Sequence, residues 1–235
     1  MPPKKPTHVE PLKDLPDELN TKIKKGSSKI VPLKTNYELL VWTNCGISYP
    51  NMIRVMTIGD GSCFFHALLN SFYMPYRTQT LDGLPITQVE LITNLRTSLA
   101  TRLGERINAM DTHYSQLGDG ALQKLSDTFP RYSLDEMQKT LADATKPIGN
   151  EYNEFISNQL NKDIYILDGT THDVYMTGDN WEKLYKNRDS IVLLYIPGHY
   201  ELISILENNI PVSLFKPDNP FITTIRNRMI ELCQQ

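Results

Sequence analysis

The stretch that most constrains the fold is residues 191–196, an unbroken run of β-prone residues. Such a run predicts a strand that is buried on both faces of a sheet. Pro197 and Gly198 follow as a tight-turn signal. The alternation of apolar residues over 199–206 then predicts a strand that returns beside the first. We therefore expect a sheet whose buried part includes these two strands.

The remaining periodicity indicates helices that precede or flank strands. Thr87 and Ser133 are each followed three positions later by Glu, a capping box in which the two residues satisfy each other's free backbone N–H groups. The predicted helices are 63–72, 87–103, 133–144, 152–160 and 221–232, and the further predicted strands are 51–58, 164–167 and 174–176. We therefore predict a mixed α/β (α+β) fold with a small central sheet flanked by helices.

Residues 1–29 differ from the rest of the chain. They hold seven lysines, four acidic residues and five prolines, and so polar a segment cannot bury enough surface to fold alone. We expect a flexible basic extension over residues 1–29 and a single domain over residues 30–235. The extension carries a net charge of +3 and the domain −6, so we expect no nucleic-acid binding by the domain. We expect the extension to be a solvated tail; the alternative is a tether to nucleic acid or to a membrane.

Composition excludes several classes of protein. No apolar run approaches the roughly 18 residues of a membrane-spanning helix, and the N-terminal segment lacks the apolar core of a signal peptide. Three cysteines in 235 residues suit a reducing compartment better than a disulfide scaffold. Cys45 and Cys233 have no neighbours that suggest chemistry. No His or Cys spacing matches a metal site, and no glycine pattern matches a dinucleotide-binding loop, so we expect neither a metal nor a cofactor.

Cys63 stands at a position that favours chemistry. It follows the turn residues 59–62 and starts a predicted helix, where free N–H groups and the helix dipole favour the thiolate. Asp60, Gly61 and Ser62 form a tight loop whose N–H groups can stabilise the oxyanion of an acyl-transfer reaction. The alternative is a small buried cysteine at a helix start, a common environment for this residue.

His199 is the candidate base for that thiol. It begins the returning strand directly after the turn, which is a rigid position for an imidazole. Glu201 faces the same side of the strand, so its carboxylate can bind one imidazole nitrogen and leave the other for the thiol. Taken alone, His199 is better explained as a turn histidine in solvent and Glu201 as an exposed acid on a strand; it is their coincidence with Cys63 that favours chemistry. The order Cys, His, carboxylate is typical of papain-like proteases.

Two boxes in the sequence resemble the ovarian-tumour (OTU) family of cysteine proteases. The first is Asp-Gly-Ser-Cys-Phe-Phe-His at 60–66, and the second is Pro-Gly-His-Tyr-Glu at 197–201. The resemblance spans about residues 50–206 and implies a papain-type fold. It also implies hydrolysis of the peptide or isopeptide bond after the C-terminal Gly-Gly of ubiquitin. Some viral members of the family also cleave ubiquitin-like modifiers.

The resemblance implies roles for the residues of both boxes. Cys63 looks like the nucleophile and His199 like the general base. Asp60 looks like the residue that props the oxyanion loop, to which Gly61 and Ser62 belong. These roles would together make the chain a thiol protease.

Two positions depart from the family's pattern. Glu201 stands where the family has Asp or Asn, so the third catalytic member stays open between Glu201 and Asp60. His66 stands where many relatives have Arg, one turn inside the helix, and we expect it to be structural. The aromatic residues near the boxes that could cover a Gly-Gly passage are Phe64, Trp181, Tyr195 and Tyr200.

The sequence therefore predicts a thiol-dependent deubiquitinase that acts on ubiquitin or polyubiquitin chains. We expect residues 74–150 to shape its ubiquitin-binding face. Two alternatives stay open: a catalytically impaired ubiquitin-binding module on the same fold, and a cysteine protease for a ubiquitin-like or other substrate. We expect a monomer that works in the cytoplasm, and in the host cytoplasm if it is a viral protein or a microbial effector.

Overall fold

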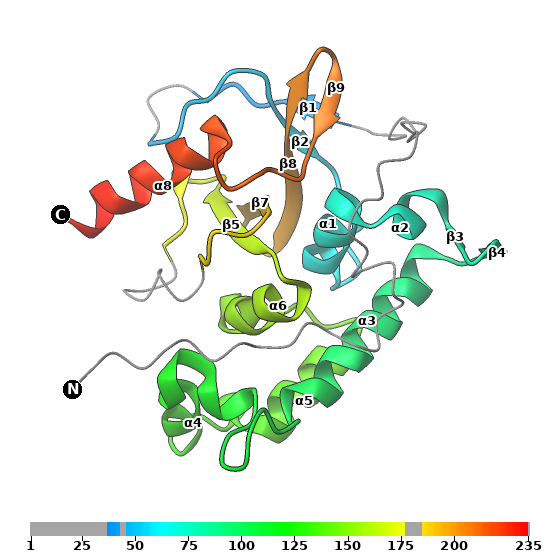
Figure 1. The fold of residues 1–235 in the computed structure, drawn as a ribbon, viewed down its shortest axis with the longest axis vertical. Coiled ribbons are helices and arrows are strands. Elements are labelled where there is room, and N and C mark those ends of the chain that lie inside the picture. The colour runs from blue at the N-terminus through cyan, green and yellow to red at the C-terminus, as the bar shows by residue number, and fades with distance from the viewer. Residues whose placement is uncertain (1–36, 43–45, 177–184, 235) are drawn as a thin grey trace.

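Strand β7 (Ser190–Ile196) lies in the middle of the sheet in the computed structural model, which describes residues 37–42, 46–176 and 185–234 (Figure 1). It pairs antiparallel with β8 (His199–Glu207) across the predicted turn, and parallel with β5 (Asp163–Asp168). The two strands predicted around this turn are therefore confirmed. The order across the sheet is β1 (Tyr37–Leu39), β2 (Met52–Val55), β8, β7, β5 and β6 (Asp173–Val174), and β9 (Ile210–Val212) pairs with the far end of β8.

Alternate residues of β7 face two separate hydrophobic cores, which is why the strand is apolar along its length. Ile191 and Leu193 pack into a core shared with helices on one side, while Val192 and Leu194 pack into a core shared with α8 (Pro220–Cys233) on the other. The helices of the first side are α1 (Cys63–Phe72), α3 (Gln88–Leu103), α5 (Leu134–Ala142) and α6 (Asn153–Leu160). Figure 1 shows these helices and α8 on opposite sides of the sheet, so the predicted α/β architecture is confirmed.

The helix starts follow their capping residues. At α3 the Thr87 hydroxyl accepts a hydrogen bond from the Glu90 N–H (3.1 Å), and the Glu90 carboxylate accepts one from the Thr87 N–H (2.8 Å). The first predicted capping box is therefore complete. At α5 the Ser133 hydroxyl accepts from the Glu136 N–H, but the Ser133 N–H donates to the Pro130 carbonyl instead of the Glu136 side chain. The second predicted capping box is therefore only half formed. This helix ends at Ala142, two residues before the predicted end.

Several short elements differ from the prediction. The strand predicted over 51–58 is confined to β2, since Asn51 has a positive φ of 57° and the chain leaves the sheet after Val55. The strand predicted over 174–176 is the two-residue β6. The elements that the periodicity did not predict are β1, β9, β3 (Thr80–Leu81), β4 (Leu84–Pro85), α2 (Met74–Thr78), α4 (Ala121–Ser126), and the 3-10 turns at Tyr114–Gly120, Pro130–Tyr132 and Asn150–Tyr152. Each is too short to show a clear period.

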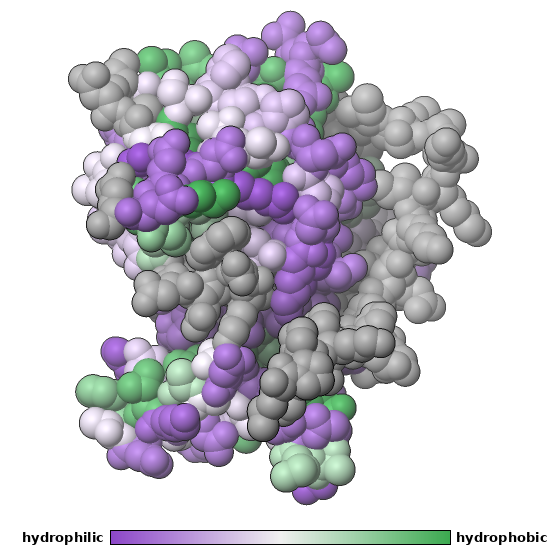
Figure 2. Space-filling model, turned by 60° about the vertical axis from the view of Figure 1, so that its left-hand side comes forward, coloured by the Kyte–Doolittle hydropathy of each residue, from purple (hydrophilic) through white to green (hydrophobic). Residues whose placement is uncertain are grey.

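The surface of the described residues is mixed in character. Figure 2 shows one side of the molecule as mainly hydrophilic, with apolar residues in small groups between polar ones. Within the described ranges, no helix is long and apolar enough to cross a membrane, and no group of three His, Cys, Asp or Glu side chains is placed to hold a metal ion. The basic extension over residues 1–29 lies outside the described residues.

Candidate active site

Cys63 is the first residue of α1, and only 5% of it is exposed. The loop before it passes through Gly61, whose φ of +90° lies in the left-handed region that glycine adopts without strain. A Cβ atom on Gly61 would lie 2.0 Å from the carbonyl oxygen of Thr145. Both the backbone conformation and the close approach of the neighbouring segment therefore require glycine in front of the thiol.

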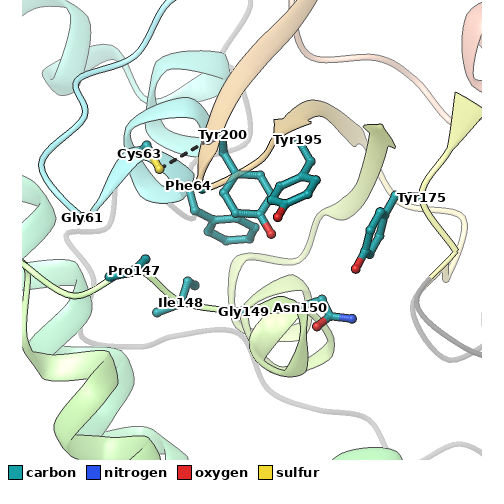
Figure 3. A pocket seen from close by; sticks show the side chains of 11 residues that line it. Gly61, Cys63, Phe64, Pro147, Ile148, Gly149, Asn150, Tyr175, Tyr195 and Tyr200 are labelled. Atoms are coloured by element: carbon teal, nitrogen blue, oxygen red, sulfur yellow. Dashed lines mark hydrogen bonds between the residues drawn. The ribbon is translucent and has the colours of Figure 1, made fainter. Parts of the chain in front are cut away.

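Strand β8 begins against this thiol. The Tyr200 N–H donates a hydrogen bond to Cys63 Sγ over 3.4 Å, although the two residues are 137 positions apart in the sequence (Figure 3). The Tyr200 ring also packs edge-on against Phe64, with 5.3 Å between the ring centroids. His199 directly precedes Tyr200, so the fold brings the two sequence boxes together at the sulfur.

The contacts of His199 identify its protonated nitrogen. Nε2 lies 3.3 Å from Thr57 Oγ1 and 3.9 Å from Glu201 Oε1. The Thr57 hydroxyl donates its one proton to the Tyr200 carbonyl, so its oxygen can only accept from the imidazole. Nε2 therefore carries the proton in the neutral ring, and Nδ1 is the basic nitrogen.

Glu201 is the carboxylate that the structure brings to His199. It is 6% exposed, and its Oε2 atom lies 3.6 Å from Arg54 Nη1. Among the described residues, Oε2 has no hydrogen-bond partner. Burial raises the pKa of Glu201, and the positive charges of Arg54 and His199 act against that rise. Glu201 therefore approaches the imidazole without a short hydrogen bond to it.

Asp60, the other candidate carboxylate, is bound within the loop and to α1. One carboxylate oxygen accepts from the Ser62 N–H (2.8 Å), and the other lies 3.0 Å from His66 Nε2. His66 is fully buried, and its Nδ1 atom lies 2.7 Å from the Tyr76 hydroxyl. Burial acts to raise the pKa of Asp60, but the hydrogen bonds from His66 and Ser62 outweigh it and leave the pKa below its usual value. Asp60 therefore braces the loop before Cys63.

The thiol of Cys63 differs from the sequence-based expectation in one respect. The helix start predicted a lowered pKa, but burial raises the pKa of the Cys63 thiol above its ordinary value. Hydrogen bonds from the Tyr200 and Phe64 N–H groups act in the opposite direction and do not overcome the burial. Burial of the sulfur therefore acts against the thiolate that the helix start favours.

A groove of about 330 Å³ opens beside Cys63. One wall is aromatic: the ring of Tyr195 lies 5.3 Å from that of Tyr200 and 5.6 Å from that of Tyr175, measured between centroids (Figure 3). Residues 147–150 line it from another segment of the chain. Three of the four predicted aromatic residues thus line the groove; the fourth, Trp181, lies outside the described residues. Tyr175 was not predicted, because β6 is too short to show which way its neighbours face.

Sequence reasoning missed Arg96 on α3. This residue is fully buried, and its guanidinium donates hydrogen bonds to Gly61 O (3.3 Å) and Ser62 Oγ (2.8 Å). A signal was present, since Arg96 lies four positions after Ile92, within the apolar face of an amphipathic helix. A cation on such a face must find acceptors inside the protein.

No protein-family model matches this sequence, and no curated protein matches it either. Solved structures do match it. An OTU domain in complex with ubiquitin is 16% identical, with 77% of this chain and 86% of that one covered, at a TM-score of 0.47. The Hazara virus OTU bound to ubiquitin is 16% identical (66% and 82% covered, TM-score 0.38), and the viral OTU domain protease from Farallon virus is 13% identical (73% and 97% covered, TM-score 0.37). The resemblance to OTU domains thus recurs among solved structures, whereas the chemistry proposed below rests on the distances within the site.

Proposed function

We propose that this protein is a thiol-dependent deubiquitinase that hydrolyses the peptide or isopeptide bond after the C-terminal Gly-Gly of ubiquitin. The observation that carries the proposal is the hydrogen bond from the Tyr200 N–H to Cys63 Sγ. It sets the strand that begins with His199 against a thiol that starts a helix and opens onto a groove. These contacts support a site in which a nucleophile, a base and space for a substrate lie together.

In the proposed mechanism, Nδ1 of His199 takes the proton of the Cys63 thiol while the sulfur bonds to the carbonyl carbon of the last glycine of ubiquitin. When the tetrahedral intermediate collapses, the C–N bond breaks and His199 returns the proton to the leaving amine. Water then attacks the thioester with His199 as base, which releases the ubiquitin carboxylate and restores the thiol. Because burial raises the pKa of Cys63, the reaction depends on a base rather than on a preformed thiolate.

The oxyanion of the intermediate needs fixed N–H donors. In the proposed enzyme these are the N–H of Cys63 at the start of α1 and that of Gly61 in the loop before it, since the Ser62 N–H is bound to Asp60. Asp60 holds the loop through the Ser62 N–H, and Gly61 permits its conformation. Glu201 orients His199 through Nε2, on the opposite side of the ring from the basic nitrogen.

Ubiquitin as the substrate is supported by the resemblance of the two boxes and by the form of the groove. An aromatic wall faces a segment that includes Gly149, while Gly61 lies next to the sulfur. Such a passage suits an extended segment without side chains, as Gly-Gly is. The net charge of −6 over residues 30–235 is compatible with the basic tail of ubiquitin.

The test is a ubiquitin whose C-terminus carries an electrophile. Wild-type protein is expected to form a covalent adduct, and Cys63→Ala to form none. Cys233→Ala is the matched control, since Cys233 is an exposed free cysteine on α8 and should leave the adduct undiminished. No adduct on wild-type protein, or an undiminished adduct on Cys63→Ala, contradicts the proposal.

One observation favours a second candidate, a ubiquitin-binding module without turnover. The distance of 3.9 Å between His199 Nε2 and Glu201 Oε1 exceeds a hydrogen bond, so this carboxylate does not hold the imidazole firmly. For such a module, ubiquitin would bind in a titration while ubiquitin chains stayed intact. A ubiquitin-like modifier with the same electrophile, assayed in parallel, tests the other alternative, a protease for a different substrate.

A further inference from the structure

Arg96 is a fully buried arginine in the middle of α3. A buried charge is costly unless its hydrogen-bond donors are satisfied. Here the guanidinium donates five hydrogen bonds, four to backbone carbonyls and one to a hydroxyl. It also lies 5.0 Å from the ring centroid of Phe65 on α1. These acceptors belong to two segments that both border the groove.

The first segment runs from the C-terminal end of α5 to residues 147–150, which line the groove. Arg96 donates to the carbonyls of Thr140 and Leu141, both at 2.8 Å, at the C-terminal end of α5. A helix end presents free carbonyls and a negative dipole there, so a cation is favourably placed. A further hydrogen bond of 2.9 Å reaches the carbonyl of Lys146, directly before the lining residues 147–150.

The second segment is the loop before the thiol. Arg96 donates to Gly61 O and to Ser62 Oγ from the same terminal nitrogen. Ser62 Oγ in turn donates to Ala144 O over 2.6 Å, so the two segments are also bound to each other. Gly61 packs on the Thr145 carbonyl too closely for any Cβ atom. The loop and the groove wall therefore meet around one guanidinium.

We propose that Arg96 is a positioning residue that holds the N–H groups of the loop 60–62 and the groove wall 147–150 in register with Cys63. Lysine cannot replace it, because a single ammonium on a flexible stem cannot reach both segments as the planar guanidinium does. The effect on turnover rests on the proposed function, whereas the effect on the two segments does not.

Arg77 provides the matched control. It donates to the carbonyls of Asn70 (2.7 Å) and Ser71 (2.6 Å), at the opposite end of α1 from Cys63. Arg77→Lys thus also disrupts paired hydrogen bonds from an arginine to backbone carbonyls, but away from the loop and the groove wall.

The first measurement is hydrogen exchange of the backbone amides in the folded full-length chain. Arg96→Lys is expected to speed exchange about tenfold or more both in residues 60–63 and in residues 143–150, and Arg77→Lys in neither. Equal exchange in the two variants overturns the proposal. This result does not depend on any activity, so it decides the role of Arg96 even if wild-type protein leaves ubiquitin uncleaved, an outcome that would sink the proposed function alone.

The second measurement is turnover of ubiquitin carrying a C-terminal fluorogenic amide. Arg96→Lys is expected to lower kcat about 10- to 100-fold with KM within about threefold, because displaced donors act on the transition state more than on binding. Alkylation of Cys63 by iodoacetamide, a small reagent that forms no oxyanion, does not use the N–H donors of the loop and should stay within about threefold of wild type. A kcat loss matched by an equal loss of alkylation overturns the proposal.

Ser62→Ala keeps the proposal testable if the Arg96→Lys chain fails to fold. This change removes the hydroxyl that links Arg96 to Ala144 and leaves the guanidinium in place. It is expected to speed exchange in both segments and to lower kcat about three- to tenfold. Unchanged exchange and unchanged kcat in Ser62→Ala refute the proposal.

Discussion

The thiol half and the imidazole half of the candidate site are held in different ways. Cys63 and the following residues of α1 are buried, and the loop before them is bound through Arg96 to a neighbouring segment. His199, by contrast, has 28% of its side chain exposed at the first residue of β8. Its approach to Glu201 is 3.9 Å. Core packing holds the first half, and a few polar contacts at a strand end hold the second.

This difference matches the chemical role proposed for each half: oxyanion stabilisation for the first and proton transfer for the second. Donors that stabilise an oxyanion are most effective when they are already fixed, because no reorganisation is then needed during the reaction. An imidazole that exchanges protons with a thiol, an amine and a water molecule has to reorient slightly between these partners. Hydrogen bonds to a catalytic base commonly tighten when substrate binds. Substitutions of core residues in the thiol half should therefore lower stability, and those in the imidazole half should lower activity with little effect on stability.

The largest expected effect is on stability, from Phe65→Ala in the thiol half. Phe65 is fully buried and packs beneath Arg96 in the core on this side of the sheet. Loss of the ring should leave a cavity and lower the free energy of unfolding by about 3–5 kcal/mol. Chemical denaturation of the wild type and the variant measures this loss in the free energy of unfolding. A loss below about 1 kcal/mol would show that core packing is not what holds this half.

The next largest effect is on activity, from His199→Gln in the imidazole half. Turnover of fluorogenic ubiquitin should fall about 1,000-fold, because the buried thiol then has no base. The thermal unfolding midpoint should change little, since the side chain is partly exposed at a strand end. Iodoacetamide should still alkylate Cys63 at alkaline pH, which shows that the thiol is intact. A fall in the unfolding midpoint as large as that of Phe65→Ala would erase the contrast between the halves.

The smallest effect is expected from Glu201→Gln, which tests how loosely the imidazole is held. A contact of 3.9 Å predicts a loss of about tenfold in turnover, as for one weak charge-assisted interaction. Full activity in this variant would exclude Glu201 from the mechanism and leave Asp60 as the remaining carboxylate.

The pH dependence of this variant follows from the raised pKa of Glu201. Only the ionised carboxylate stabilises a protonated His199, so the activity loss should be largest above that pKa and should vanish as the pH falls below it. A carboxyl whose pKa is raised on folding contributes stability below its unfolded pKa, and this contribution is lost as the pH rises. Glu201→Gln should therefore leave the thermal midpoint at pH 7 unchanged or higher; a lower midpoint would contradict this account.

The long helices and strands could be predicted from the sequence, and the shortest strands could not. α1 was predicted with the correct bounds, 63–72, because a glycine turn precedes a run with clear helical spacing. β7 was predicted from its continuous apolar run, which exists because the two faces of the strand pack into two separate cores. The two-residue strands β3, β4 and β6 depend on pairing with a neighbour, which local sequence does not encode strongly.

The site was predictable where local context sufficed. Cys63 and His199 are recognisable as candidates because each follows a turn and begins a regular element. The sequence could not distinguish Glu201 from Asp60 as the partner of the imidazole, since that depends on which carboxylate the folded chain brings near. Nor could it identify the role of Arg96, whose acceptors lie 34 to 50 positions away.

The sequence by itself therefore determined the architecture, the nucleophile candidate and the base candidate, because turn signals and periodicity act over a few residues. Only the tertiary structure decided the surroundings of the thiol and of the imidazole. Burial of Cys63 outweighs the helix start and raises the pKa of the thiol, and the Thr57 hydroxyl sets the tautomer of His199. These properties depend on the dielectric environment and on donors from distant segments, which exist only once the chain has folded.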